Sequence, residues 1–343
     1  MAEPILSVRD LKTQFFGPEG VVRAVDGVDF DVFPGRTLGV VGESGCGKSV
    51  TARSVLGIVD RPGRVVGGSI MLRRAGGGPA TDLAQLSNEE MRKIRGPEIA
   101  LVFQEPMASF SQHYTIGNQI GEGIKLHLGL DNRAARKRSI ELLDMVGVPQ
   151  PARRVDDYPF QLSGGLRQRV MIAMALSCDP RVLIADEPTT ALDVTTQAQI
   201  LDLLRSLQQQ KGLAIILITH DMGVIAEMAH DVSVMYLGRA VETGSVQDIF
   251  NAPKHPYTRA LLRSIPTVLA KPRTRLPTIA GTIPHPFERP KGCSYNPRCG
   301  EIIGAVCEKY EPPAVDTDDG RQVRCFLHGG MDTAQAAIAG APA

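Results

Sequence analysis

The sequence predicts an α/β fold in which a mostly parallel sheet is flanked by helices. Short apolar runs at residues 99–103, 182–185, 213–219 and 232–237 are separated by segments compatible with helix. Such an alternation is typical of buried parallel strands connected by helices. Hydrophobic residues make up 43% of the 343-residue chain and charged residues 22%. These values are usual for soluble globular proteins and exclude a wholly disordered or fibrous chain.

Two strands and one helix are expected near the N-terminus. Residues 28–32 alternate between apolar and polar side chains, and residues 37–41 form a short apolar run that ends at a glycine-rich turn. Residues 49–57 contain no proline and end at a glycine, which indicates a helix that begins directly after the turn. The predicted order is therefore strand, glycine-rich loop, helix.

Two regions interrupt this pattern. Residues 105–168 contain helical patterns, notably at residues 134–146, and no obvious buried strand, so we expect a helical subdomain inserted into the α/β core. Twelve of the 24 prolines and four of the six cysteines lie from Pro253 onward, and this composition predicts a small, separate, loop-rich C-terminal extension. We place the core domain at residues 1–255 and the extension at residues 256–343.

Charge and hydropathy exclude several classes of protein. The 38 Lys and Arg residues nearly balance the 37 Asp and Glu residues, and a net charge of +1 argues against a nucleic-acid partner. The longest apolar runs, at residues 170–178 and 213–219, are far shorter than the roughly 18 residues of a membrane helix. The N-terminal segment does not resemble a secretion signal, so we expect a cytosolic protein. Cysteines of such a protein are thiols or metal ligands rather than disulfides.

A phosphate-binding motif lies between the first predicted buried strand and helix. Residues 42–49 read Gly-Glu-Ser-Gly-Cys-Gly-Lys-Ser and match G-x-x-x-x-G-K-[ST]. In this motif inward-turned amide groups and a helix N-terminus cradle phosphate, the lysine reaches the terminal phosphates, and the serine ligates Mg²⁺. An incidental lysine after a glycine turn is the alternative. We predict nucleoside triphosphate binding by Gly42, Ser44, Gly45, Cys46, Gly47, Lys48, Ser49 and Val50.

A pair of carboxylates ends a later strand. Residues 181–188 read Arg-Val-Leu-Ile-Ala-Asp-Glu-Pro. The two acids could form only a solvated strand end, but ligands of such sheets bind at the carboxyl ends of the strands. Asp186 is then expected to hold Mg²⁺, and Glu187 to act as the general base that polarises the attacking water.

A third motif, together with the first two, indicates a protein family. Residues 162–169 read Leu-Ser-Gly-Gly-Leu-Arg-Gln-Arg and precede an expected helix at residues 170–177. Ser-Gly-Gly at a helix start is a further anion cradle, or only a helix cap. Together the three motifs resemble those of the ATP-binding subunits of ABC transporters, whose signature is LSGGQ. Leu166 replaces the glutamine here and leaves the Ser-Gly-Gly cradle intact.

The resemblance covers roughly residues 4–262 and implies an ABC ATPase core built on the phosphate-binding fold. Gln104 matches the glutamine that contacts Mg²⁺ and senses the membrane subunits. Residues 191–193 match the segment that contributes Asp193, and His220 matches the histidine that contacts the γ-phosphate. The resemblance thus implies catalytic roles for Glu187, His220 and Gln104, Mg²⁺ ligation by Ser49, Gln104 and Asp186, and ATP as the nucleotide.

The adenine ring of ATP needs a flat apolar partner. Phe16, just before Gly17, stands where this family places its stacking aromatic residue. Phe15 is the neighbouring candidate, and one of the two is expected to pack into the core.

The family resemblance also implies partners. Its members pair two cassettes, and Ser163, Gly164 and Gly165 of one complete the nucleotide site of the other. A single copy of each motif means that this chain pairs with itself or, as we expect, with a homologous ATPase subunit. Two integral membrane permease subunits and an extracytoplasmic peptide-binding protein are implied as well. The chain would then be a peripheral protein at the cytoplasmic face of the cell membrane.

The substrate class is suggested by residues 255–262. They read His-Pro-Tyr-Thr-Arg-Ala-Leu-Leu and resemble the start of the C-terminal extension of dipeptide and oligopeptide permease ATPases. The alternative is a proline-bounded helix start that packs locally. We expect an ATP-hydrolysing subunit of a peptide importer. An importer of another substrate such as nickel, a soluble ABC clamp acting in translation or DNA maintenance, and a P-loop kinase are the alternatives.

Four cysteines of the extension are expected to bind a group. They are spaced C-x5-C-x7-C-x17-C in a region too poor in apolar residues to pack well by itself. Four thiolates suit zinc or an iron–sulfur cluster, and C-x2-C pairs common in zinc sites are missing. The family resemblance favours a 4Fe-4S cluster over zinc or unligated thiols. The predicted ligands are Cys293, Cys299, Cys307 and Cys325, with His285 and His328 as possible substitutes, whereas Cys46 and Cys178 are expected to be packing residues.

Overall fold

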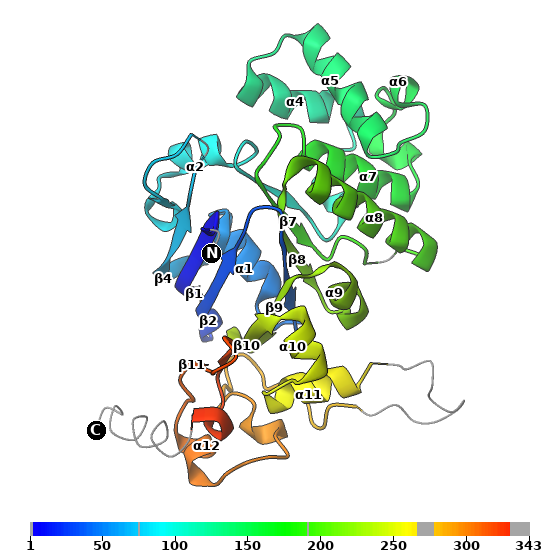
Figure 1. The fold of residues 1–343 in the computed structure, drawn as a ribbon. Helices are drawn as coiled ribbons and strands as arrows, with labels where there is room; N and C mark the ends of the chain where they lie inside the picture. The colour runs from blue at the N-terminus through cyan, green and yellow to red at the C-terminus, as the bar shows by residue number, and fades with distance from the viewer. Residues whose placement is uncertain (1–2, 75, 191, 266–277, 330–343) are drawn as a thin grey trace.

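The structure, a computed structural model, describes residues 3–74, 76–190, 192–265 and 278–329. Two sheets occupy the middle of the molecule, a group of helices forms a layer at the top of Figure 1, and the C-terminal extension lies at the bottom. No helix in these four ranges has an apolar stretch long enough to cross a bilayer.

Within the described residues the central sheet has eight strands, which are β3 (Thr37–Val41), β6 (Ile99–Val102), β7 (Val182–Asp186), β8 (Ala214–Thr219), β9 (Asp231–Tyr236), β10 (Arg239–Ser245), β11 (Val315–Asp316) and β12 (Gln322–Val323). Their order is β11-β12-β10-β9-β3-β8-β7-β6. The five strands from β9 to β6 pair in parallel, and the other three are added antiparallel. Every residue of β3, β7 and β8 is buried, which explains their continuous apolar sequence. The predicted α/β class with a mostly parallel sheet is confirmed.

A second, antiparallel sheet was largely missed by the sequence analysis. It is formed by β1 (Leu6–Gly17), β2 (Gly20–Val32), β4 (Gly63–Leu72) and β5 (Thr81–Asp82), in the order β2-β1-β4-β5. Only residues 28–32 of it were predicted as strand. Register shifts between β1 and its two neighbours break the strict alternation of apolar and polar residues, and such irregularities blur the period-two signal of a strand.

Helices connect and cover the sheets. α1 (Lys48–Val55) lies between the two sheets, since it contacts β1, β2 and β4 on one side and β7 on the other. α9 (Met222–Met228) packs on β3 and β8. The remaining helices of the core region are η1 (Leu83–Gln85), α2 (Asn88–Ile94), α8 (Val194–Lys211) and α10 (Val246–Asn251).

The expected helical insertion is present. It comprises α3 (Pro106–Ser109), α4 (Ile116–Leu128), α5 (Asn132–Met145), α6 (Pro151–Arg154) and η2 (Pro159–Gln161), and it leads into α7 (Gly164–Ala175). The helix predicted at residues 134–146 is α5, which begins earlier because Asp131 caps it by accepting a hydrogen bond from the amide of Ala134. In Figure 1 α4, α5 and α6 lie at the far end of the molecule from the extension.

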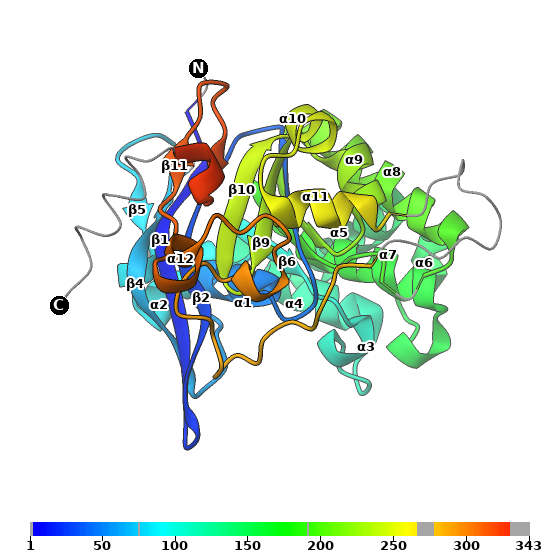
Figure 2. The same ribbon diagram turned by 90° about the horizontal axis from the view of Figure 1, so that it is seen from below.

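The extension is rich in loops, as predicted, but it is not separate from the core. It contains α11 (Pro256–Arg263), η3 (Asn296–Arg298), α12 (Ala305–Lys309) and the short strands β11 and β12. β12 pairs with β10, so the extension continues the central sheet. Figure 2 shows α11 lying close to β9 and β10. The expectation of a separate region is corrected, and the division at residue 255 stays a prediction.

Candidate functional site

The phosphate-binding loop, residues 42–49, joins the end of β3 to the start of α1. Its backbone needs glycine where it turns most sharply. Gly47 has φ of 102°, and a side-chain carbon at this position would lie 2.3 Å from the carbonyl oxygen of Ala24 on β2. No larger residue fits there, so β2 fixes the loop from behind. The loop therefore has the form that turns amide groups inward to bind phosphate.

Lys48 points into the loop. Its side chain is buried, and its ammonium group donates hydrogen bonds to the carbonyl oxygens of Gly42 at 2.7 Å and Glu43 at 3.2 Å. The lysine charge is thus placed where the loop would hold a phosphate chain. The neighbouring Cys46 is a buried core residue, as expected.

Two of the three predicted Mg²⁺ ligands, Ser49 and Asp186, come from distant parts of the chain and meet. The Ser49 hydroxyl donates to the Asp186 carboxylate at 2.9 Å, which links the first turn of α1 to the end of β7. Burial raises the pKa of Asp186, and a bound cation would stabilise its charged form. Hydroxyl and carboxylate oxygens are the ligands that Mg²⁺ prefers, so the two residues fit the ion.

Glu187 is held by three neighbours from different elements. Its carboxylate accepts hydrogen bonds from the Gln104 amide at 3.0 Å and the Thr190 hydroxyl at 2.9 Å. Nδ1 of His220 lies 3.3 Å from its other oxygen. Glu187 itself has φ of 47°, in the left-handed region that costs a non-glycine residue free energy. Its amide compensates by donating to the carbonyl of Ile218.

Parallel strands explain why these residues meet. The phosphate-binding loop follows β3, Gln104 follows β6, Asp186 ends β7 and His220 follows β8. Because the four strands run in the same direction in neighbouring positions, their carboxyl ends lie along one edge of the sheet. The structure therefore brings together all predicted hydrolytic residues.

Phe16 is exposed near the end of β1, and the Arg64 guanidinium lies over its ring, 4.4 Å from the ring centre. Phe15 is less exposed and packs beside Gly63, where an added carbon would lie 2.6 Å from its ring. This difference agrees with Phe15 as the packing residue of the pair. The adenine-stacking role of Phe16 stays a prediction.

The Ser-Gly-Gly signature lies at the start of α7. Ser163 caps this helix by accepting a hydrogen bond from the amide of Leu166, so the helix begins at Gly164 rather than at residue 170. Ser163 and Gly164 are exposed. Within the described ranges, no hydrogen bond or ion pair joins the signature to the phosphate-binding loop. These exposed groups are accessible to a second molecule.

Asp193 plays a similar local role one helix later. It caps α8 by accepting from the amide of Thr196 at 3.0 Å, and its side chain is exposed. Ala191, the first residue of the predicted 191–193 segment, lies outside the described residues.

Comparisons with known proteins agree with this arrangement. The family described as ABC transporter matches residues 25–190, and the family described as oligopeptide/dipeptide transporter, C-terminal region, matches residues 241–307. The chain is 47% identical over 321 residues to the dipeptide transport ATP-binding protein DppD of Escherichia coli (strain K12), covering 94% of this chain and 96% of that protein. It belongs to the ATP-binding subunits of ABC transporters.

Other relatives support the same assignment. A Brucella abortus protein named as a peptide import ATP-binding protein is 50% identical over 322 residues, which cover 94% of each chain. The dimeric structure of MJ0796, a bacterial ABC transporter cassette, superposes with a TM-score of 0.62 at 25% identity and covers 70% of this chain and 98% of that one. The ABC ATPase fold is therefore shown.

The four cysteines of this ABC ATPase's extension line one small pocket. Cys293, Cys299, Cys307 and Cys325 all contribute to it, and none of the four forms a disulfide. The loops are held together by a hydrogen bond from the amide of Cys293 to the carbonyl of Cys307. Spacings of up to 17 residues in the sequence thus converge at one place.

Burial raises the pKa of Cys293 to about 12 and that of Cys325 to about 11, and the neighbouring cysteines add to both shifts. Binding of a metal would have to displace the thiol protons. No group of three or more His, Cys, Asp or Glu side chains in the described part of the chain is arranged to hold a single metal ion.

Some residues at these sites were missed by the sequence analysis. His255 lines the cysteine pocket, whereas the proposed substitutes His285 and His328 do not. Thr190 donates a hydrogen bond to Glu187. The only feature of the sequence that could have indicated this contact is that Thr190 lies three residues after Glu187. Glu43 and Arg298 form an ion pair between the phosphate-binding loop and the extension. No local pattern predicts a contact between residues so far apart in the sequence.

Proposed function

We propose that the chain is the ATP-hydrolysing subunit of an importer that moves dipeptides or oligopeptides across the cell membrane. The observation that carries the proposal is the convergence of Gln104, Asp186, Glu187 and His220 on the phosphate-binding loop. Family membership and the peptide importers among the relatives supply the substrate class.

Each residue has a task in hydrolysis. Lys48 and the loop amides bind the phosphates, and Phe16 stacks on the adenine. Mg²⁺, which Ser49 and Asp186 would hold with Gln104 nearby, neutralises phosphate charge when bound. The Glu187 carboxylate takes a proton from the attacking water, whose oxygen bonds to the γ-phosphorus as the bond to ADP breaks. His220 lies beside Glu187 and is exposed enough to contact the γ-phosphate.

A second ATPase subunit completes the site. Ser163, Gly164 and Gly165 at the exposed start of α7 would bind the nucleotide of the opposing cassette, and Asp193 lies at the exposed start of α8. We propose a heterodimer with a homologous subunit.

An apolar groove beside Gln104 suits a membrane subunit. It lies between the core and the helical subdomain and has a volume of about 450 Å³. Leu126 on α4 lines it and is 74% exposed, and Phe103, the residue before Gln104, is also exposed. Exposed apolar side chains in a concave surface mark an interaction site. We propose that a cytoplasmic segment of one permease subunit docks here and places the chain at the cytoplasmic face of the membrane.

Leu126→Asp is expected to uncouple the chain from the membrane subunits. A carboxylate in this groove would lose its hydration on docking, which costs several kcal/mol, so co-purification from detergent-solubilised membranes should fall at least about tenfold. Leu128→Asp is the matched control, because Leu128 is on the same helix and exposed but does not line the groove. Equal recovery of membrane proteins with both variants would contradict the proposed docking site.

Transport itself tests the proposed function. The complex purified with its membrane subunits and binding protein, placed in liposomes, should take up radiolabelled dipeptide only with ATP. If the liposomes took up nickel and no dipeptide, the proposed peptide substrate would be wrong and the chain would belong to a nickel importer. A chain that brings no integral membrane protein through purification would instead favour a soluble ABC clamp.

We propose that the four cysteines hold a 4Fe-4S cluster. Support comes from the four thiols around one pocket and from the resemblance of the extension to that of the peptide permease ATPases. Anaerobically purified protein is expected to be coloured and to contain about four iron atoms per chain, and Cys299→Ser should lower the iron content. Colourless protein with one zinc per chain would favour zinc, and metal-free protein would favour unligated thiols.

A further inference from the structure

Arg298 of the extension forms an ion pair with Glu43, the second residue of the phosphate-binding loop. Both guanidinium nitrogens of Arg298 pair with the Glu43 carboxylate, at 2.7 and 3.0 Å. The Arg298 side chain is only 3% exposed and the Glu43 side chain 23% exposed, so this two-point contact is partly buried. Two-point contacts between arginine and a carboxylate have a better defined geometry than ordinary surface ion pairs.

A second residue of the extension holds the backbone of the same loop position. The amide of Glu43 donates to the hydroxyl of Tyr257 at 3.0 Å. The Tyr257 ring is fully buried and packs against Tyr236 and Tyr295, with ring centres 4.7 and 5.4 Å apart. The side chain and the backbone of Glu43 are thus both fixed by residues that follow the core.

Arg298 and Tyr257 are themselves anchored. Arg298 precedes Cys299 and donates through Nε to the carbonyl of Ala280. Tyr295 lines the cysteine pocket, so the aromatic cluster and the pocket share a wall. Movement of the cysteine-bearing loops would therefore move the groups that hold Glu43.

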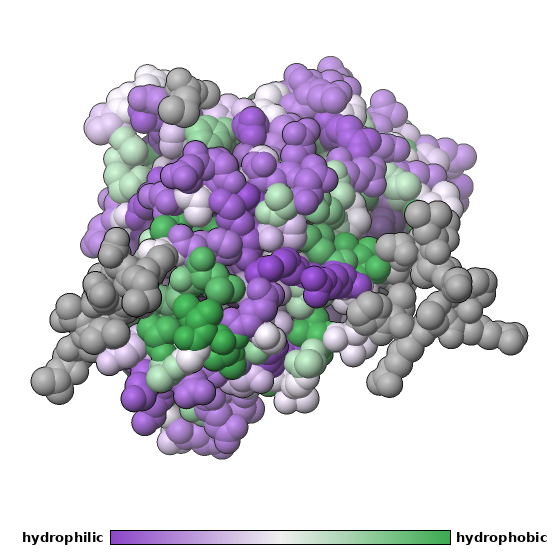
Figure 3. Space-filling model, turned by 60° about the horizontal axis from the view of Figure 1, so that its bottom comes forward, coloured by the Kyte–Doolittle hydropathy of each residue, from purple (hydrophilic) through white to green (hydrophobic). Residues whose placement is uncertain are grey.

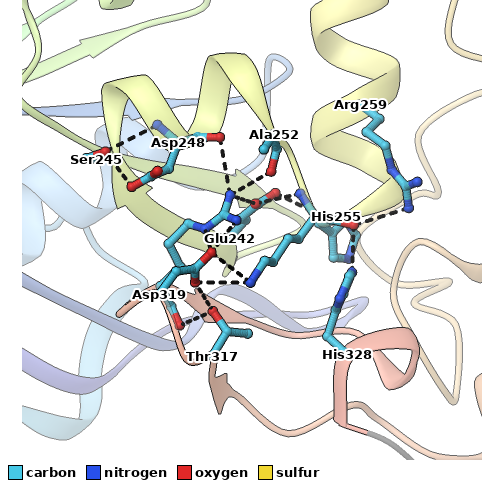
Figure 4. Close-up of polar contacts among 11 residues, drawn as sticks. Glu242, Ser245, Asp248, Ala252, His255, Arg259, Thr317, Asp319 and His328 are labelled. Carbon is cyan, nitrogen blue, oxygen red and sulfur yellow. Dashed lines mark hydrogen bonds and ion pairs between the residues drawn. The ribbon is translucent and has the colours of Figure 1, made fainter.

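Figure 4 shows how the other end of the extension is fixed to the core. The buried Glu242 carboxylate on β10 accepts hydrogen bonds from the amides of Lys254 and His255, at 2.8 and 2.9 Å. His255 Nδ1 in turn accepts from the amide of Tyr257, and His328 forms a hydrogen bond to the Lys254 carbonyl. This network sets the position of Tyr257 beneath the loop.

The charge of Glu43 gives the contact a consequence for binding. A carboxylate in a loop that binds triphosphate repels the ligand unless a cation compensates it. Arg298 supplies that cation and also turns the carboxylate toward the extension. Losing Arg298 should therefore leave an uncompensated negative charge in the loop and release its backbone.

We propose that the extension sets the nucleotide affinity of this ABC ATPase by holding Glu43 through Arg298 and Tyr257. Arg298 and Tyr257 act as positioning residues that do not touch the nucleotide. The inference rests on the proposed function, because it requires ATP to bind at this loop.

The extension also carries an apolar surface of its own. Figure 3 shows an apolar patch on this side of the molecule. The exposed apolar side chains of the extension include Ile302, Ile303 and Leu327. Stability of each variant has to be measured together with binding.

The test is a titration of the full chain with a fluorescent ATP analogue and Mg²⁺. Arg298→Ala is expected to raise the Kd between about 5- and 100-fold, the usual range of coupling between sites. Lys309→Ala, which removes an exposed cation of α12 in the same extension, is the matched control and should leave the Kd unchanged. Thermal unfolding reports whether each variant is folded.

The double variant separates positioning from general damage. Glu43→Ala removes the repelling carboxylate, so in the Arg298→Ala background it should lower the Kd again, whereas loss of the fold would not be rescued. A Kd for Arg298→Ala equal to that of the unmodified chain would overturn the inference. So would additive effects of Arg298→Ala and Glu43→Ala on the binding free energy in the double variant. Failure of the unmodified chain to bind the analogue would instead overturn the proposed function.

Discussion

Replacing Glu187 by glutamine is expected to abolish ATP turnover while ATP binding persists. Glutamine has the same shape and can still accept a hydrogen bond from Gln104 and Thr190, which contact the native carboxylate. It cannot take a proton from water, and a general base contributes about 10²- to 10⁴-fold to the rate. Steady-state phosphate release should fall by this factor. The Kd for Mg-ATP should stay within about twofold, because the phosphate-binding loop is unchanged.

The variant should also trap the assembled dimer, since ATP bound between two cassettes is no longer hydrolysed. Size-exclusion chromatography with Mg-ATP would detect the shift. Glu227→Gln is the control, because it removes an exposed carboxylate that pairs with Arg205 on the surface and should hydrolyse ATP normally. Unchanged hydrolysis by Glu187→Gln would assign the base to another residue.

The candidate site was predicted from two kinds of signal. Asp186 and Glu187 were expected from their place at the end of an apolar run, whereas Gln104 and His220 were implied by the family resemblance. The parallel sheet brings the ends of these strands together, and this explains why residues so far apart in the sequence meet. The boundaries were less accurate, as at α7, whose start depends on the Ser163 cap rather than on the apolar run.

The antiparallel sheet and the extension depend on contacts that local sequence does not encode. β1 carries shifts of register against both of its partners, so its alternation is broken. From the sequence alone, Arg298 would be taken for an ordinary surface cation in a proline-rich segment. In the structure its side chain is buried and pairs with Glu43. Its role becomes visible only when the extension folds back onto the core.

The phosphate-binding loop is held from two sides, and this suggests how the molecule divides its tasks. Gly47 rests on β2 inside the core, while Glu43 is held by Arg298 and Tyr257 of the extension. The part fixed by the core has no room for a side chain at Gly47. The part fixed by the extension depends on the side chains of Arg298 and Tyr257, through which we propose that the nucleotide affinity is set.

Lys48→Ala is expected to weaken nucleotide binding itself, in contrast to Glu187→Gln. A hydrogen bond to a charged group contributes about 1.5–3 kcal/mol, so the Kd for Mg-ATP should rise about 10- to 100-fold. Hydrolysis should fall with it at any ATP concentration below the new Kd. Isothermal titration calorimetry would measure the affinity directly, and Lys211→Ala, which removes an exposed cation paired with Asp179, serves as the control.

Lys48→Ala removes the two hydrogen bonds from the ammonium group to the carbonyls of Gly42 and Glu43. The loop should still remain in place, because Gly47 packs against β2 and the bonds that Glu43 forms with Arg298 and Tyr257 do not involve the ammonium group. An unchanged melting temperature together with weakened binding would therefore locate the effect in the lost charge. A tight Kd for the variant would mean that the amide groups alone bind the phosphates, and Lys48 would then act only in stabilising charge during hydrolysis. Comparing the two variants separates phosphate binding from activation of water in a single chain.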